Sequence, residues 1–176
     1  VDRSVSLEEA KEFMQGLGTG RAVIIKAIAG GGGRGTRAVT DPAELEEAFK
    51  ACQREAEAAF GIGDLYVEEF LPSARHVEVQ ILGDLEGQVT HLSERECSIQ
   101  RRNQKVIEIA PAPALDAGLR NLMIDAAMRF ASHEGYSNLG TFEFLIDTSA
   151  PHGEQRFVFI EANARLQVEH TVTEEV

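Results

Sequence analysis

The polar end of one apolar strand constrains this chain more than any other feature. The apolar run at residues 157–160 predicts a buried strand. Polar side chains then occupy every second position, and residues two apart share one face of an extended chain. A salt-bridged strand at the edge of a sheet is the alternative interpretation. If the chain stays extended, one wall of a site is formed by Glu161, Asn163, Arg165, Gln167 and Glu169.

The chemistry of this segment suggests a metal ion beside an anion. Carboxylate and amide oxygens, here from Glu161 and Asn163, are the hard ligands that Mg2+ prefers in proteins. The guanidinium of Arg165 suits the capture of an anion, and the carboxylate of Glu169 suits proton transfer.

A further carboxylate, Glu143, lies in the apolar strand predicted at residues 139–147. A carboxylate in such a strand is costly unless it is paired or bound to a metal. Together with Glu161 and Asn163 it forms a candidate octahedral Mg2+ site that phosphate oxygens would complete. Pairing of Glu143 with a basic side chain such as Lys105 or Arg165 is the alternative.

Composition and charge exclude several classes of function. The chain has 176 residues and a formal net charge of -12, from 29 acidic and 17 basic residues. This charge argues against non-specific binding of nucleic acid, but not against binding a nucleotide with Mg2+. No apolar run reaches the length of a membrane span, and no signal peptide is visible. We therefore expect neither nucleic acid nor a membrane as a partner.

Two lone cysteines indicate a reducing compartment. Cys52 and Cys97 have no metal-ligand spacing, so each is interpreted as a small buried hydrophobic residue. Without an export signal, they fit a cytoplasmic location or an organelle matrix such as that of the mitochondrion. The chain begins without Met and stops at residues 173–176, which resemble the start of a helix, so we expect a piece of a longer polypeptide.

The first 70 residues predict a small α+β unit with a glycine-rich loop. Helices are expected at residues 7–17 and 41–59, and strands at 21–27, 37–40 and 65–70. The glycines at residues 30–35 let backbone N–H groups approach phosphate oxygens, and Lys26 on the preceding strand can reach them. A merely flexible loop is the alternative.

Two familiar nucleotide motifs do not fit this loop. The dinucleotide fingerprint must open a helix, whereas a strand is predicted after Gly35. A Walker A loop ends in Gly-Lys-Ser/Thr, and no lysine follows these glycines. A glycine-rich flap over a nucleotide fits better.

Residues 71–176 predict a second unit built mostly of antiparallel strands. The expected strands are at residues 75–82, 88–94, 105–109, 139–147 and 156–162, with a polar loop at 95–104 and a helix from about 115 to 130. In the first of these strands Val77, Val79 and Ile81 alternate with polar residues, so the apolar side chains share a core face.

In this arrangement the chain closely resembles the biotin carboxylase family of the ATP-grasp fold. The motifs appear in the family's order over nearly the whole chain, at residues 23–26, 30–35, 68–71, 75–78, 94–102, 104–106, 140–144 and 165–170. Residues 108–112 and 170–175 look more like the pyruvate carboxylase branch than the acetyl- or propionyl-CoA carboxylases. The resemblance implies a lid subdomain at residues 1–70 and part of a catalytic subdomain at 71–176.

The resemblance also implies roles for individual residues. Mg2+ (or Mn2+) would be held by Glu143, Glu161 and Asn163. Bicarbonate would be bound by Lys105, Arg165, Gln167, Val168 and Glu169, among which Lys105, Arg165 and Glu169 would act in catalysis. ATP would be bound by Lys26, Gly31, Gly32, Gly33, Arg34, Gly35, Glu68, Glu69, Leu71, His76, Gln100 and Asn103.

The chain departs from the family pattern at three of its positions. Glu69 stands where a lysine is familiar, and Asn103 stands where histidine is common. Thr36 replaces a larger apolar residue that usually packs over the adenine. We expect a modest change in nucleotide affinity rather than its loss.

The implied function is the ATP-dependent carboxylation of biotin through carboxyphosphate. The implied partners are a biotin carboxyl carrier domain and a carboxyltransferase domain, with homo-oligomer contacts through regions outside this chain, so the chain alone is expected to be incomplete and inactive. Two other functions stay open: a bicarbonate-phosphorylating ligase of the carbamoyl phosphate synthase type, and a nucleotide-binding module without catalysis.

Overall fold

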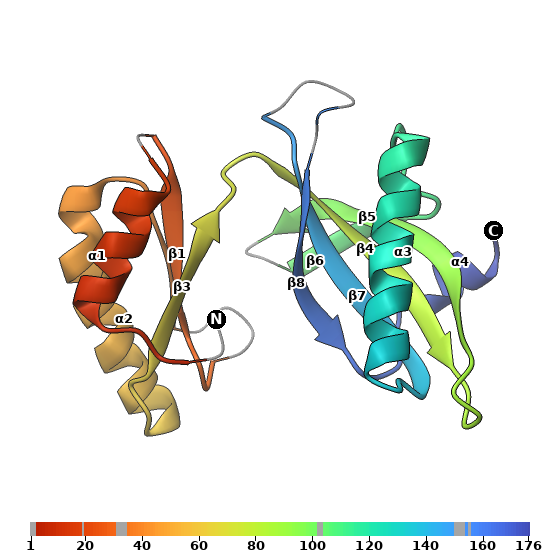
Figure 1. Cartoon of the computed structure of the whole chain (residues 1–176), viewed down its shortest axis with the longest axis horizontal. Coiled ribbons are helices and arrows are strands. Elements are labelled where there is room, and N and C mark those ends of the chain that lie inside the picture. Colours follow the sequence, from red (N-terminus) through yellow and green to blue (C-terminus); the bar gives the residue numbers. More distant parts are fainter. Residues whose placement is uncertain (1–2, 19, 31–34, 102–103, 150–153, 155) are drawn as a thin grey trace. The chain divides into compact units, whose positions relative to one another are not determined.

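The computed structural model describes residues 3–18, 20–30, 35–101, 104–149, 154 and 156–176. The chain divides into two compact units, Val1–Pro72 and Ser73–Val176. Each unit is described by itself, and Figure 1 shows the elements of both. Among the described residues, no helix is both long and apolar enough to cross a membrane.

The first unit packs two helices against a three-stranded antiparallel sheet of order β2-β1-β3 (Figure 1). The side chain of Ser6 accepts a hydrogen bond from the N–H of Glu9, and the Glu9 carboxylate accepts one from the N–H of Ser6. This predicted capping box fixes the start of the first helix. In chain order the elements are α1 (Leu7–Gly16), β1 (Ala22–Ala27), β2 (Thr36–Val39), a 3-10 turn η1 (Pro42–Glu44), α2 (Leu45–Phe60) and β3 (Leu65–Phe70).

The chain that follows the glycine loop confirms that the loop does not open a helix. Gly35 has a φ of 68°, and β2 begins at the next residue, Thr36. A Cβ atom on Gly35 would lie 2.9 Å from the Cβ of Ala27, so both the backbone angle and the space favour glycine here. Gly31, Gly32, Gly33 and Arg34 lie outside the described residues.

The second unit is a five-stranded antiparallel sheet of order β6-β5-β4-β7-β8 with α3 on one face. Asp116 caps α3 by accepting a hydrogen bond from the N–H of Leu119. In chain order the elements are β4 (Ala74–Gly83), β5 (Val89–Arg101), β6 (Gln104–Ile109), α3 (Ala117–His133), β7 (Asn138–Asp147), β8 (Phe157–Asn163) and α4 (His170–Glu174).

The two faces of β4 are both buried, although only one is apolar. The predicted core face is confirmed: Val77, Val79 and Ile81 are fully buried and belong to a cluster with side chains of α3 and β7. On the opposite face, Glu78 is 0% exposed and Gln80 is 2% exposed. A layer of buried polar groups therefore lies against the side of the sheet opposite the apolar core.

The prediction of a polar loop at residues 95–104 is wrong. The strand β5 continues to Arg101, and β6 begins at Gln104. Arg95 and Glu96 are buried because their charges are paired across strands, with Glu78 and Arg75 respectively. Polar composition alone therefore misled the prediction, since an ion pair within a sheet lets a charged residue occupy a strand.

The expectation of a single extended wall over residues 161–169 is also wrong. The strand β8 ends at Asn163, where the N–H of Arg165 donates to the carbonyl of Asn163 in a tight turn. The chain then enters α4 at His170, earlier than the predicted helix start at residue 173. Only Glu161 and Asn163 share a strand face, and Glu169 approaches Lys105 from beyond the turn.

Candidate functional site

A single lysine lies among three carboxylates in the polar layer of the second unit. Lys105 projects from β6, and its Nζ atom donates to an oxygen of Glu78. The same Nζ lies 3.3 Å from Oε1 of Glu143 and 3.5 Å from Oε1 of Glu169. One amine is therefore close to Glu78 on β4, to Glu143 on β7 and to Glu169 in the turn before α4.

The electrostatics of this cluster keep Lys105 charged. Burial works against the ammonium form, but the negative charges of Glu78 and Glu143 outweigh it and raise the pKa of Lys105. A permanent ammonium in this position can neutralise an anion such as a phosphoryl group. Glu143 therefore pairs with Lys105, as the alternative to a metal site expected, and this pairing does not exclude a metal.

Glu143 is held in its ionised form by three neighbours. Its burial favours the neutral acid, but His76 and Lys105 outweigh this effect and lower the pKa of Glu143. The Nε2 atom of His76 lies 2.6 Å from Oε2 of Glu143. The side-chain amide of Asn163 donates to Oε1 of Glu143 over 2.7 Å.

The three predicted metal ligands lie together at the β7–β8 edge. Glu143 and Glu161 are paired across the two strands, and the amide of Asn163 donates to both carboxylates, over 2.7 and 3.3 Å. Rotation of that amide would present its oxygen instead, completing a set of hard oxygen donors. The residues therefore fit Mg2+.

The balance of charge around these ligands also favours a cation. The cluster contains two cationic side chains, Lys105 and Arg95, and a larger number of carboxylates. The atoms of His76, Glu78 and Glu143 that can bind a metal lie within 4.8 Å of one another, so the negative charge is concentrated. Placing this many carboxylates together is costly unless a divalent ion compensates them. The carboxylates in contact with these cations are Glu78, Glu108, Glu143 and Glu169, and the amide of Asn163 joins Glu161 to Glu143.

Two residues predicted near the ribose are in direct contact. The side-chain amide of Gln100 donates to the carbonyl of Cys97 and lies 2.7 Å from Nδ1 of His76. If the amide nitrogen donates to Nδ1, the ring carries its proton on Nε2, which lies 2.6 Å from Oε2 of Glu143 but forms no hydrogen bond within the described residues. Gln100 therefore fixes His76 in an orientation that serves the predicted metal ligand. The third residue expected there, Asn103, lies outside the described residues.

The predicted ATP-binding residues of the first unit form two ion pairs. Lys26 Nζ lies 2.5 Å from Glu68 on the neighbouring strand β3, and Arg21 lies 2.7 Å from Glu69. Leu71, just after β3, is 8% exposed. The charge of Lys26 is thus offset locally, and its amine stands next to the residue predicted to meet the adenine.

Four of the five predicted bicarbonate residues lie in the segment just before α4, and the fifth, Lys105, lies on β6. Arg165 and Val168 are exposed, and within the described part of the chain Arg165 makes no ion pair. Gln167 has a buried Oε1 atom for which the described residues provide no hydrogen-bond donor. An unpaired guanidinium and an unsatisfied amide beside Glu169 are suited to binding a small anion or its proton.

Three residues of the cluster were not predicted as site residues: Glu78, Arg95 and Glu108. Glu78 accepts hydrogen bonds from Arg95 and from Lys105, so it joins the two cations. A signal was present, since Glu78 lies between Val77 and Val79 in a strand where a carboxylate needs partners. Glu108 follows the same logic between two isoleucines, but Arg95 was obscured by the expected loop.

Glu108 is the acid whose protonation is most disturbed. Burial, reinforced by the charges of Glu78 and Glu169, raises the pKa of Glu108 from 4.5 to about 7. Its Oε2 atom is buried, accepts no hydrogen bond from the residues that the structure describes, and lies 3.5 Å from Nε of Arg95. The folded protein therefore binds a proton here that the unfolded chain releases at lower pH.

We expect Glu108 to make the protein less stable as the pH rises from 5 to 8. Between the unfolded and folded pKa values the native state binds more protons, so the free energy of unfolding falls with increasing pH. A shift of this size would correspond to about 3 kcal/mol without screening, and screening by solvent at this partly exposed group lowers the expected change to about 2 kcal/mol. Urea denaturation at both pH values should show that Glu108→Gln removes this part of the dependence, whereas the exposed Glu86→Gln keeps it. Equal slopes for Glu108→Gln and the wild type would contradict the assignment.

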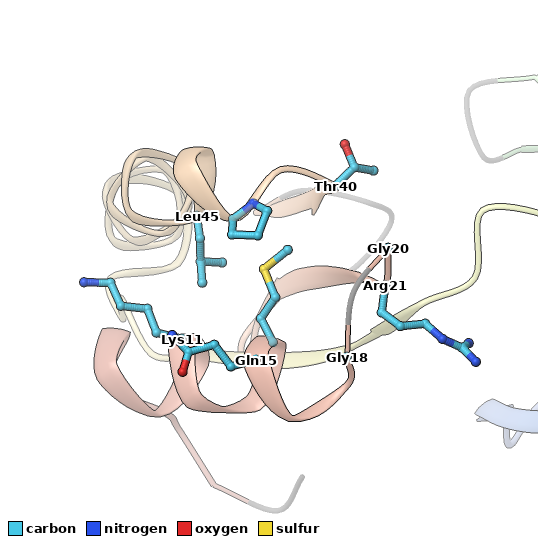
Figure 2. Close-up of a pocket in the computed structure, with 9 residues that line it drawn as sticks. Lys11, Gln15, Gly18, Gly20, Arg21, Thr40 and Leu45 are labelled. Atoms are coloured by element: carbon cyan, nitrogen blue, oxygen red, sulfur yellow. The ribbon is translucent and has the colours of Figure 1, made fainter.

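The first unit has a separate cavity of about 520 Å3 (Figure 2). Met14, Pro42 and Leu45 form its apolar lining, while the charged ends of Lys11 and Arg21 point outward on opposite sides. Its size is typical of a ligand site. However, none of the described residues predicted to bind ATP lines it.

Two features of this antiparallel α+β fold indicate an ATP-grasp domain. One is the unit that contains the glycine-rich loop, and the other is the sheet whose polar face carries paired acidic and basic side chains. The family model described as "Carbamoyl-phosphate synthase L chain, ATP binding domain" matches residues 2–176, and the chain belongs to this family. Among curated proteins, pyruvate carboxylase 1 of Caenorhabditis elegans is 55% identical over 169 residues. Mitochondrial pyruvate carboxylase of Homo sapiens is 53% identical over 171 residues. These matches cover 96% and 97% of this chain but 14% of each relative.

Solved structures show the same fold. Biotin carboxylase of Campylobacter jejuni, in a β,γ-ATP complex, has a TM-score of 0.89 and 45% identity, covering 99% of this chain and 37% of that one. The biotin carboxylase domain of Hydrogenobacter thermophilus 2-oxoglutarate carboxylase, a dimer with MgADP and bicarbonate, has a TM-score of 0.87 and 43% identity with the same coverage. The predicted ATP-grasp fold, the resemblance to biotin carboxylases and the preference for the pyruvate carboxylase branch are confirmed.

Proposed function

We propose that this chain is the ATP- and Mg2+-binding core of a biotin carboxylase, which activates bicarbonate to carboxylate biotin on a carrier domain. The observation that carries the proposal is the position of Lys105 within reach of Glu78, Glu143 and Glu169. Lys105 lies between the predicted metal ligand Glu143 and the predicted base Glu169. A cation in this position can stabilise the charge of a transferred phosphoryl group while the base removes a proton from the acceptor. Family membership over residues 2–176 supports the same conclusion.

In the proposed reaction, Glu169 accepts the proton of bicarbonate. The bicarbonate oxygen forms a bond to the γ-phosphorus, and the bond from that phosphorus to the bridging oxygen of ADP breaks, giving carboxyphosphate. Lys105 neutralises charge on the transferred oxygens, and Arg165 holds the anion. Bound Mg2+ would supply Lewis-acid stabilisation of the phosphate oxygens, held by Glu143, Glu161 and Asn163. The bond from the carboxyl carbon to the phosphate oxygen then breaks, that carbon forms a bond to N1 of biotin, and the departing phosphate takes the proton that N1 loses.

The proposed roles of the first unit concern the nucleotide. Lys26 would contact ATP phosphates under the flap formed by residues 31–35, and Glu68, Glu69 and Leu71 would meet the adenine. His76 and Gln100 would lie at the ribose, with Asn103 beside them. A glycine flap would exclude water, which otherwise hydrolyses carboxyphosphate. In these terms residues 1–70 are the lid and residues 71–176 part of the catalytic subdomain.

We also infer the partners and location from the relatives. The chain spans 14% of the curated pyruvate carboxylases. A biotin carboxyl carrier domain would present biotin to this site, and a carboxyltransferase domain would act on the carboxylated biotin. One related biotin carboxylase domain is described as a dimer, which supports a homo-oligomer, and another relative is described as a complete multifunctional pyruvate carboxylase, which supports further domains in the same protein. The mammalian relatives are named mitochondrial, which fits a mitochondrial matrix or, in a bacterium, the cytoplasm.

ATP hydrolysis by the complete protein separates this function from its alternatives. A biotin carboxylase requires both bicarbonate and biotin for steady ATP turnover. A ligase of the carbamoyl phosphate synthase type would hydrolyse ATP with bicarbonate alone and gain nothing from biotin. A protein that binds MgATP yet never hydrolyses it would be a nucleotide-binding module, and the proposal would be wrong.

Mg2+ should change the affinity of this chain for ADP. We expect calorimetric titration with ADP to give tighter binding when Mg2+ is present, because the acidic cluster needs a cation before it can accept phosphates. An increase of about tenfold in affinity corresponds to roughly 1.4 kcal/mol. The control is the same titration in EDTA. Equal affinity with and without Mg2+ would contradict a metal site at residues 143, 161 and 163.

A further inference from the structure

One buried arginine connects the two sides of the candidate site. Arg95 is 0% exposed, and its Nε and Nη2 atoms donate to Oε1 of Glu78 over 2.7 and 2.5 Å. Its Nη1 atom donates to Gln80 over 2.8 Å and to the hydroxyl of Thr173 over 2.5 Å. The guanidinium therefore bonds to β4 and, through one hydroxyl, to α4.

The contact with Thr173 anchors the segment that carries the proposed base. α4 begins directly after Glu169, and Thr173 is its buried residue, 3% exposed. The preceding turn has little apolar attachment, since Arg165, Leu166 and Val168 are all exposed. A turn with few buried contacts takes its position from the elements at its ends. One of those ends is β8, and the other is the helix bonded to Arg95.

The same guanidinium also fixes the opposite side of the site. Glu78 accepts from Arg95 with one oxygen and from Lys105 with the other. Lys105 in turn lies 3.5 Å from Glu169, so the contacts form a closed ring. The ring runs from Arg95 through Glu78 and Lys105 to Glu169, and it returns to Arg95 through α4 and Thr173. All of these residues lie within Ser73–Val176.

We propose that Arg95 is a positioning residue, which sets the separation of the proposed base Glu169 from Lys105 by holding Thr173 and Glu78 at the same time. The proposal rests on the proposed function, because it assigns a catalytic use to that separation. A charged, planar donor suits this task, since its bonds have fixed directions and are stronger than those between neutral groups. Arg95 itself contacts no substrate in this scheme.

The hydroxyl of Thr173 can be removed without disturbing the ion pair. In the complete protein, Thr173→Val keeps the shape of the side chain but removes the acceptor, whereas Thr173→Ser keeps the acceptor. Thr171→Val is the matched control, because Thr171 is exposed on the same short helix. We expect Thr173→Val to lower kcat/KM for bicarbonate about tenfold, the effect of losing one hydrogen bond to a charged group. The KM for ATP should change less than twofold.

The outcomes separate positioning from a general loss of structure. Normal bicarbonate kinetics for Thr173→Val would overturn the proposal, as would an equal loss for Thr173→Ser or for Thr171→Val. Hydrogen exchange provides a readout that does not depend on activity: amides at residues 164–174 should exchange faster in Thr173→Val alone. If the wild type shows no bicarbonate-dependent turnover, the proposed function fails, while unchanged exchange in Thr173→Val would reject the anchor itself.

Discussion

Glu161→Gln is expected to reduce ATP turnover by about 100- to 1,000-fold in the complete protein, because a neutral amide cannot replace a carboxylate ligand of Mg2+ without loss of charge stabilisation. The folded structure should be unaffected, since Glu161 is exposed and its interaction within the described residues is the 3.3 Å hydrogen bond from Asn163. Steady-state ATP hydrolysis over a range of Mg2+ concentrations measures the first effect. Thermal unfolding measures the second.

The design of this test depends on the difference between Glu161 and its neighbour Glu143. Glu143 is 4% exposed and contacts His76 and Lys105, so replacing it would disturb packing as well as chemistry. Glu161 offers the chemical change alone. The exposed Glu86→Gln, in the hairpin between β4 and β5, is the control and should retain full turnover. Full turnover by Glu161→Gln would remove this residue from the metal site.

Periodicity predicted most of the elements because only one face of each is apolar. The alternation of Val77, Val79 and Ile81 indicated β4, and the apolar stripe at residues 115–130 indicated α3, although Leu122 and Phe130 of that stripe are exposed. Capping residues Ser6 and Asp116 set helix starts close to the expected ones. These features are local, so a single sequence contains them.

The failures in prediction have a common physical origin. Residues 95–101 are polar yet lie in a strand, because Arg95 and Glu96 find their partners on β4, which is distant in sequence. The turn after Asn163 was missed because nothing in its composition breaks an extended chain. Pairing of buried charges is a tertiary property, and neither alternation nor turn propensity reports it.

Which residues belong to the candidate site could be predicted from the sequence better than which contacts join them. Resemblance placed Lys105, Glu143 and Glu169 in one site, and their side chains lie together. It gave no reason for Glu78, whose importance appears only when both cations are seen to share its oxygens. The roles of these residues as ligands or base stay predictions until the variants are measured.

Removal of the buried cation should have the largest effect on stability. We expect Arg95→Met to lower the free energy of unfolding by about 3 to 5 kcal/mol, because the fully buried Glu78 would lose one of its two cations. Glu108, 3.5 Å from Arg95, would also lose its nearest guanidinium. Denaturant unfolding followed by circular dichroism measures the change, and Arg129→Met, on the exposed face of α3, should alter it by less than about 0.5 kcal/mol.

The origin of this loss can be tested with a second substitution. If the cost arises from an uncompensated charge, adding Glu78→Gln to Arg95→Met should restore part of the stability, because the buried carboxylate is then neutral. If the cost arises from the lost hydrogen bonds to Gln80 and Thr173 instead, the double variant should be no more stable than the single one. A loss below about 1 kcal/mol for Arg95→Met alone would contradict both accounts, since it falls within the range of an exposed ion pair.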